Sequence, residues 1–301
     1  MAFRFLAGAG SALYITAAVS FVADVSTAEN RGRLMTIYQS FFLIGITLGP
    51  AFGGLTAHFL GLRAPFYFVA ALAGVAGVWT LARIPSDVGQ STARRSRGPT
   101  VRRATPDAQA NSPLRSLLFV SVCLIAMATF FTRGGTLFTL WPLLGEKRFG
   151  MDAGMLGLLL TIPAVANLAF QPFAGVLSDR LGRHAMVLPV VVVFVGSLLV
   201  SAASPVVAVF GLAMVMYGLA QAIESPTVNA YVADIATGDQ RPVALATMRT
   251  FGDVGLVVGA PLLGLIADVA GLSWGLVANA VIVLACGMPF LLSKAGRALH
   301  P

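Results

Sequence analysis

The chain has 301 residues, of which 57% are hydrophobic and 11% charged, and its formal net charge is +8. Charged residues make up about 25% of an ordinary soluble domain, so a water-exposed surface of the usual kind is excluded and an integral membrane protein is predicted. The apolar runs are long enough, at roughly 20 residues, for helices to cross a bilayer, and they lack the alternation of a membrane β-barrel. The predicted class is an all-α polytopic membrane protein.

About nine membrane-spanning helices are expected, because nine apolar runs are separated by charged residues or by proline and glycine. We place them near residues 3–23, 35–58, 64–84, 116–141, 153–177, 186–203, 205–231, 244–268 and 273–293. The segment between the third and fourth runs is rich in Arg, Ser, Thr and Pro, which predicts a flexible linker. The predicted organisation is therefore a group of helices in 1–84, a basic linker in 85–115 and a bundle in 116–301.

The basic residues predict the orientation of the chain, because cytoplasmic loops carry an excess of Lys and Arg. With the loop after the first span in the cytoplasm, 15 of the 20 basic residues lie on the cytoplasmic side. They are Arg31, Arg33, Arg83, Arg94, Arg95, Arg97, Arg102, Arg103, Arg115, Arg180, Arg183, Arg241, Arg249, Lys294 and Arg297. The linker and the C-terminus are thus predicted to be cytoplasmic, in a plasma-membrane protein that contacts the lipid bilayer and no nucleic acid. The linker arginines are expected to be solvated and to set the topology, and a specific site for anionic lipid is the alternative.

The chain contains an internal repeat. Residues 21–62 align with residues 231–272 without a gap and with thirteen identical positions. A spacing this long indicates two halves of one bundle protein rather than a solenoid. Spans one to three match spans seven to nine, whereas spans four to six have no counterpart, so two equal halves would need three further helices before Met1.

The sequence lacks the usual signatures of enzymes and metal sites. Cys123 and Cys286 lie inside apolar runs, where each behaves as a small hydrophobe, so neither a disulfide nor a metal site is predicted. We find no HExxH motif, no phosphate-binding glycine loop with its Lys and no convincing Ser/His/Asp grouping. An enzyme and a cofactor are therefore not expected.

A glycine-rich run in the second span carries the most specific signal. Residues 45–54 read GITLGPAFGG, with glycines that share one helix face and allow a neighbouring backbone to approach, and a proline that bends the helix. Gly45, Gly49, Pro50, Gly53 and Gly54 match the helix 5 signature GxxxGPxxGG of drug:proton antiporters. The chain therefore resembles the major facilitator superfamily of secondary transporters. Ordinary small-residue packing is the alternative interpretation.

A second signature lies between the fifth and sixth spans, where GVLSDRLGRH matches the superfamily's cytoplasmic loop GxLxDRxGRR. The matched residues are Gly175, Asp179, Arg180, Gly182 and Arg183. The resemblance implies that this loop latches one conformation of the transporter, with gating roles for Asp179 and Arg183. The alternative is a solvated turn whose charges only set the topology.

Charged residues near the first span and at two helix corners are further candidates. Arg4 begins RFLAGAG, which resembles the helix 4 signature RxxxGxG, whose Arg the family ties to proton transfer; the alternative is that it snorkels to the interface. Asp24 and Arg31, and in the repeat Asp234 and Arg241, have the spacing of cytoplasmic helix-loop-helix corners. For these pairs we favour structural and gating roles over contact with a solute.

Polar residues inside the later spans are candidates for proton coupling or for the substrate cavity. Glu224 precedes a proline that interrupts its helix, and carboxylates at membrane depth are the usual proton carriers in coupled transport. Arg249 and Asp253 are four residues apart and share a helix face, which predicts an ion pair. The remaining candidates are Arg133, Asn167 and Gln171; for the last two, hydrogen bonding between helices is at least as well supported as contact with a solute.

The resemblance covers the chain from what would be helix 4 to helix 12. It implies two helical bundles, a partial N-terminal one of three helices and a complete C-terminal one of six. It also implies a monomeric transporter that exports a small organic solute or drug in exchange for protons, with the proton gradient in place of a cofactor. One alternative is transport of a sugar or other metabolite by the same fold. The other is a truncated, non-transporting fragment, whose start would be misassigned or whose first three helices would be lost.

Overall fold

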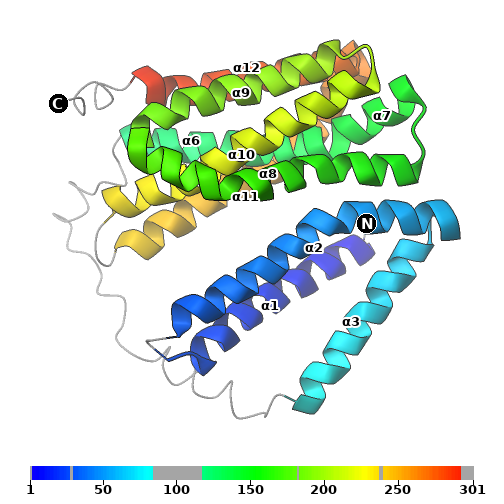
Figure 1. Cartoon of the computed structure of the whole chain (residues 1–301), viewed down its shortest axis with the longest axis vertical. Coiled ribbons are helices and arrows are strands. Elements are labelled where there is room, and N and C mark those ends of the chain that lie inside the picture. The colour runs from blue at the N-terminus through cyan, green and yellow to red at the C-terminus, as the bar shows by residue number, and fades with distance from the viewer. Residues whose placement is uncertain (1, 28–29, 84–116, 182, 237–239, 293–301) are drawn as a thin grey trace. The chain divides into compact units, whose positions relative to one another are not determined.

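The computed structural model describes residues 2–27, 30–83, 117–181, 183–236 and 240–292. Every regular element in these ranges is a helix (Figure 1), as the composition predicts. The described parts fall into two compact units, which we treat separately. The linker predicted for 85–115 lies outside the described residues, so the division into 1–84, 85–115 and 116–301 stays a prediction.

The first unit contains α1 (Ala2–Val25), most of α2 (Arg31–Leu60) and α3 (Ala64–Arg83). Large apolar side chains are exposed along all three helices, and no described residue of α3 is buried. Apolar surface of this extent is typical of helices that face lipid.

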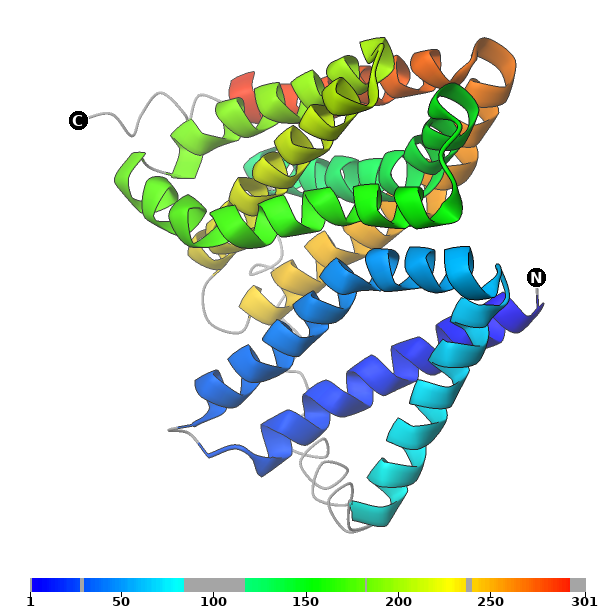
Figure 2. The ribbon, with the colours of Figure 1, turned by 45° about the vertical axis from the view of Figure 1, so that its right-hand side comes forward.

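The second unit contains residues 50–59 of α2 and all the later elements. These are α6 (Leu117–Thr132), the π-helix η2 (Arg133–Leu140), α7 (Trp141–Phe149), α8 (Ala153–Leu181), α9 (Arg183–Ala203), α10 (Val207–Ile235), α11 (Gln240–Ala270) and α12 (Leu272–Leu292). Helices α8, α9 and α10 pack together, α6, α11 and α12 pack together, and α9 joins the two groups through α12 (Figures 1 and 2).

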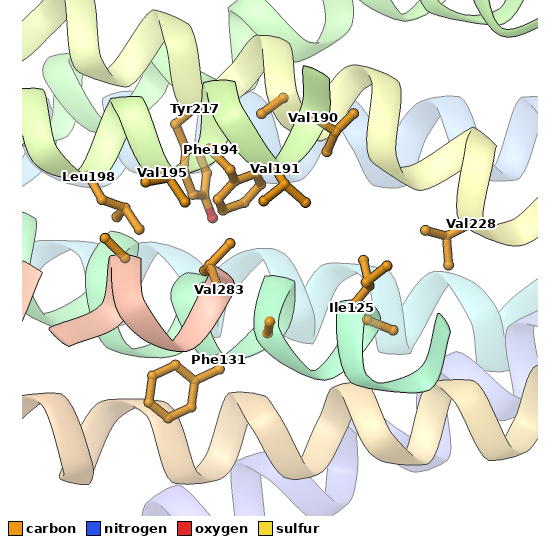
Figure 3. Close-up of a cluster of buried hydrophobic side chains, with 14 of the residues drawn as sticks. Ile125, Phe131, Val190, Val191, Phe194, Val195, Leu198, Tyr217, Val228 and Val283 are labelled. Atoms are coloured by element: carbon orange, nitrogen blue, oxygen red, sulfur yellow. The ribbon is translucent and has the colours of Figure 1, made fainter. Parts of the chain in front are cut away.

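Aromatic rings occupy the core of the second unit. Trp141 and Tyr217 have no exposed surface, and their ring centroids are 5.2 Å apart. The ring centroids of Phe194 and Tyr217 are 5.0 Å apart, and those of Phe210 and Trp141 are 6.0 Å apart. Figure 3 shows Phe194 next to Tyr217. The indole Nε1 donates a hydrogen bond of 3.2 Å to Ser201 Oγ, so the polar part of this buried ring also has a partner.

Eight helical stretches among the described residues are long and apolar enough to cross a membrane, and Leu6–Val22 is a shorter apolar stretch. Most span ends agree with the sequence prediction to within a few residues, but the end expected at residue 141 is wrong. The helical chain continues through η2 and α7 to Phe149 and ends at Gly150, whose φ is 63°. The reason is that Pro142 lies in the first turn of α7, where proline is tolerated, and that the charges at residues 146–148 do not end the helix either.

Candidate functional site

A buried carboxylate lies inside the second unit, on α10. The side chain of Glu224 is 9% exposed, and it is the one buried carboxylate among the described residues. It borders a cavity of about 20 Å³, which has room for about one water molecule. The rest of the lining, partly visible in Figure 3, consists of Ile125, Ala128, Thr129, Val190, Val191, Phe194, Val283 and Gly287. An ionisable group in such apolar surroundings is a functional candidate because its charge is costly to hold there.

Polar side chains from α6, η2 and α10 surround this carboxylate. Thr129 shares a side-chain hydrogen bond with Glu224, and the positive charge of Arg133 interacts with it. The buried Tyr217 interacts with both charges, and Gln221 Nε2 donates to its hydroxyl at 3.2 Å. The structure thus brings together two sequence candidates, Arg133 and Glu224. It adds Thr129, Tyr217 and Gln221, of which Gln221 stands one helical turn and Tyr217 two helical turns before Glu224.

The π-helix that begins with the half-buried Arg133 packs closely against α11. A methyl group on Gly134 would lie 3.3 Å from the carbonyl carbon of Leu256, and one on Gly135 would lie 2.7 Å from the carbonyl oxygen of Gly259. Residues with a side chain would therefore force α11 away from η2. π-Helical turns are rare in proteins, and those that do occur are often found at functional sites. The sequence Arg-Gly-Gly is therefore a stronger candidate for part of the site.

A second polar cluster joins α12 to the junction of α6 and η2. Asn279 Nδ2 donates to Thr136 Oγ1 at 2.8 Å, and Thr132 Oγ1 lies 3.2 Å from Asn279 Oδ1 and 2.8 Å from the carbonyl oxygen of Ala128. All three side chains have no exposed surface. Asn279 is not among the residues predicted from the sequence, although a lone amide in the apolar run of α12 is a usable signal.

The ion pair predicted on α11 is present. Arg249 Nε lies 3.4 Å from Asp253 Oδ1, and the two side chains are 67% and 57% exposed. The guanidinium also lies over the ring of Phe130, 4.9 Å from its centroid. Neither member of the pair lines the cavity beside Glu224.

The two amide candidates on α8 lie apart from the buried carboxylate. Asn167 is half-buried and Gln171 is exposed, and neither lines the cavity. Within the described part of the chain neither amide has a hydrogen-bond partner, so the hydrogen bonds between helices that the sequence allowed are not observed there.

The glycine signature of α2 contains positions in two different environments. Among the described residues, no atom of another element lies within 4 Å of where a side chain would begin on Gly45, Gly49 or Gly53. Gly54 lies against α8: a methyl group there would be 2.7 Å from the Cα atom of Gly157. The close backbone approach predicted for this signature is therefore observed at Gly54.

The end of α2 also forms an ion pair with the start of α8. Pro50 begins the α2 segment that belongs to the second unit, and near its end His58 Nδ1 lies 2.9 Å from Asp152 Oδ2. The other oxygen of Asp152 accepts a 2.7 Å hydrogen bond from the backbone N–H of Met155, as in a helix N-cap. This backbone hydrogen bond and, after it, the charge of His58 lower the pKa of Asp152 below its ordinary value.

The remaining sequence candidates lie outside what the structure describes. Gly182 is not described at all, and for the others the backbone is helical but the side-chain environment is not described. These are Arg4, Asp24, Arg31, Gly175, Asp179, Arg180, Arg183, Asp234 and Arg241.

Comparison with known proteins identifies a matching family and several relatives. The family model described as Major Facilitator Superfamily matches residues 1–152 and 122–299. Citrate exporter 1 of Aspergillus niger is 36% identical over 85 residues, which cover 28% of this chain and 16% of the exporter. Multidrug resistance protein 2 of Bacillus subtilis is 22% identical over 268 residues, which cover 88% of this chain and 65% of that protein.

The fold has solved counterparts. The human organic anion transporter MFSD10 matches with a TM-score of 0.60 and 21% identity, over 90% of this chain and 66% of that structure. The all-helical transporter fold expected from the sequence is therefore confirmed. This chain spans less than two thirds of the length of each of these three proteins.

Proposed function

This chain belongs to the major facilitator superfamily of membrane transporters, and on that premise we propose that it exports small organic solutes in exchange for protons. Glu224 is the proposed proton-binding group. The observation that carries this proposal is the burial of Glu224 beside a water-sized cavity, within reach of Arg133. Similarity to a multidrug resistance protein and the antiporter glycine signature support export.

The hydrogen bonds around Glu224 differ between its two protonation states. Thr129 Oγ1 lies 3.0 Å from the carbonyl oxygen of Ile125 and also shares a hydrogen bond with Glu224. A hydroxyl has one proton, so Thr129 can donate to Ile125 or to an ionised Glu224, but not to both. A protonated Glu224 can itself donate to Thr129, which then keeps its bond to Ile125. Protonation would thus reverse the direction of the bond that joins α10 to α6 and would restore the bond between Thr129 and Ile125 within α6.

The charges of Glu224 and Arg133 give a physical reason for coupling proton binding to solute transport. An ionised Glu224 in an apolar cavity depends on the nearby charge of Arg133, whereas a protonated Glu224 does not. Proton binding to Glu224 would therefore leave Arg133 free to interact with other groups. Loss of the proton would restore the interaction between Arg133 and Glu224. We propose that this exchange accompanies the alternating access of the transporter, with neutral or cationic amphipathic solutes as cargo.

Transport in everted membrane vesicles tests the proposal. Vesicles that contain the 301-residue chain should accumulate a fluorescent cationic dye when their lumen is acidified, and a protonophore should abolish the accumulation. Glu224→Gln, which keeps the shape of the side chain but cannot ionise, should reduce the rate at least about a hundredfold, the lower end of the range assigned to general acid–base groups. Glu146→Gln is the matched control, because Glu146 is exposed on α7. Full activity of Glu224→Gln at equal expression would contradict the assigned role.

Export of organic acids is a second candidate, favoured by the local similarity to a citrate exporter. In this case Arg133 would bind the carboxylates of the solute. The same vesicles should then accumulate radiolabelled citrate and not the dye, and Arg133→Gln should abolish uptake. If well-expressed protein moves neither solute, the 301-residue chain does not carry either activity by itself, and the non-transporting alternative becomes the first choice.

We also propose that the linker and the C-terminus lie in the cytoplasm, as the distribution of basic residues predicts. The α9–α10 and α11–α12 connections would then face outward. In a variant without native cysteines, Val206→Cys, at an exposed position before α10, should react with a membrane-impermeant thiol reagent added to whole cells. Labelling only after the membrane is opened would reverse the orientation.

A further inference from the structure

A shallow depression lies where α7 ends and where α11 turns into α12. Its volume is about 500 Å³, and it is separate from the cavity beside Glu224. The lining consists of Lys147, Arg148, Ala270, Gly271, Leu272, Ser273 and Trp274. Gly271 makes the sharp turn possible, because its φ of 98° is unfavourable for residues with a side chain.

The two cations of this depression have no anionic partner among the described residues. Arg148 donates to three neutral acceptors: the carbonyl oxygens of Ala202 and Ser204, at 3.0 and 3.2 Å, and Ser273 Oγ, at 2.6 Å. Lys147 has neither a hydrogen bond nor an ion pair within the described part of the chain. Three of the five N–H donors of Arg148 are used, which leaves two free for a ligand.

Acidic residues nearby in the sequence do not neutralise this pair of charges. Glu146 and Asp268 belong to the same two helices, but neither lines the depression. Among the described side chains, ion pairs are seen between Arg249 and Asp253 and between His58 and Asp152, and none reaches Lys147 or Arg148. The depression therefore presents net positive charge.

The ends of the apolar helices place the depression where a membrane interface is expected. Three membrane-length stretches end or begin at its rim: Leu118–Phe149, Val243–Ala270 and Leu272–Phe290. Trp274 is 63% exposed, and tryptophan is enriched where the hydrocarbon of a bilayer meets its headgroups. A ligand held here would touch the basic pair with its polar part and the indole with its apolar part.

We infer that this depression binds the phosphate-bearing headgroup of an anionic phospholipid. Lys147 supplies a free ammonium group, and Arg148 supplies free N–H donors on a guanidinium already fixed by its bonds to the loop after α9 and to α12. The exposed indole favours a lipid over a free phosphate ion, because a free ion would gain nothing from it. The inference rests on residues outside the proton site and does not depend on the proposed transport function.

Quenching of tryptophan fluorescence by brominated lipids tests this inference. The purified 301-residue chain, carrying Trp79→Phe, is reconstituted into vesicles with brominated phosphatidylglycerol or brominated phosphatidylcholine. Trp274 is then the one exposed tryptophan, because Trp141 is fully buried. Phosphatidylglycerol should quench at a mole fraction at least about fivefold lower than phosphatidylcholine, since each basic residue near a membrane surface contributes about that factor.

Three variants separate a site from a general charge effect. Lys147→Gln should remove most of the preference for phosphatidylglycerol, and Lys147→Arg should retain it. Arg63→Gln removes a positive charge that does not line the depression and should leave the preference unchanged.

Two results would overturn the inference. Equal quenching by the two lipids, or an unchanged preference in Lys147→Gln, would show that no headgroup is recognised here. Displacement of phosphatidylglycerol by millimolar inorganic phosphate would show that the depression binds a small free anion instead of a lipid.

Discussion

Gly255 of α11 lies so close to Met127 of α6 that a methyl group on it would be 3.0 Å from the carbonyl carbon of Met127. Its counterpart in the internal repeat, Gly45, has no neighbour within 4 Å among the described residues. The same holds for the next pair: a methyl group on Gly259 would be 3.0 Å from the carbonyl carbon of Phe131, whereas no atom of another element in the described part of the chain lies within 4 Å of one on Gly49. At these two positions of the repeat, the described residues therefore show close helix packing in the second copy and not in the first.

Substitution of these glycines should have opposite effects in the two copies. We expect Gly255→Ala to lower the free energy of unfolding by about 1–3 kcal/mol, because the methyl group would push α11 away from α6. Gly45→Ala is the matched control and should be neutral or stabilising by up to about 1 kcal/mol, because alanine favours helix more than glycine does. Unfolding midpoints in mild detergent compare the two variants. Equal destabilisation by both would contradict the packing difference.

The pair formed by His58 and Asp152 predicts a specific dependence on pH. The folded pKa of Asp152 is lowered, so its ionised form stabilises the fold above the unfolded value of about 3.9, and this stabilisation is lost as the pH falls through the folded pKa. Asp152→Ala should therefore have a lower unfolding midpoint than the parent chain at neutral pH. The difference should shrink on acidification below pH about 4.

His58→Gln is the companion variant for this test. The backbone hydrogen bond from Met155 is the largest cause of the lowered pKa of Asp152, so His58→Gln should reduce the midpoint less than Asp152→Ala does. A gap between Asp152→Ala and the parent chain that stays constant from neutral to acidic pH would refute the assigned linkage.

The ion pair on α11 should contribute little through its charges. Both side chains are more than half exposed, so Asp253→Asn should change the free energy of unfolding by less than about 0.5 kcal/mol. Arg249→Ala should cost more, by about 0.5–1 kcal/mol, because it also removes the contact with the ring of Phe130. Denaturant titrations of both variants test the order, and a larger effect of Asp253→Asn would contradict it.

The polar cluster at Asn279 should couple α12 to η2. We expect Asn279→Leu to destabilise the protein by about 1–2 kcal/mol, because it leaves Thr136 without its partner in a buried site. Thr136→Val should add little in the Asn279→Leu background, since the bond is already lost. A double-mutant cycle measures this coupling, and strictly additive effects would show that the two side chains act independently.

Much of the helical framework could be predicted from local patterns. The apolar runs predicted the spans, and the repeat aligned Gly61 with Gly271, which both adopt positive φ at the turn after a long helix. The spacing of Arg249 and Asp253 predicted their ion pair, because contacts four residues apart are set by the helix itself.

Contacts between distant helices could not be predicted in this way. Asn279 and Thr136 are 143 residues apart, and their hydrogen bond depends on how α12 packs against η2. The same is true of the approach of Gly157 to Gly54 and of the surroundings of Glu224, which come from three other helices. The sequence identified Glu224 as a buried carboxylate in a helix, but tertiary packing decides which groups surround it.

The π-helix between Arg133 and Trp141 makes the fold depend on the number of residues in this segment as well as on their identity. Each of its turns encloses one residue more than an α-turn, so the residues after it lie on a different side of the helix than an unbroken α-helix would give them. With the observed length, Trp141 and Leu144 both have no exposed surface. Removal of one residue from this segment would rotate both toward lipid and away from the aromatic core, even if every remaining residue were unchanged. Insertions and deletions here should therefore be tolerated less well than most single substitutions.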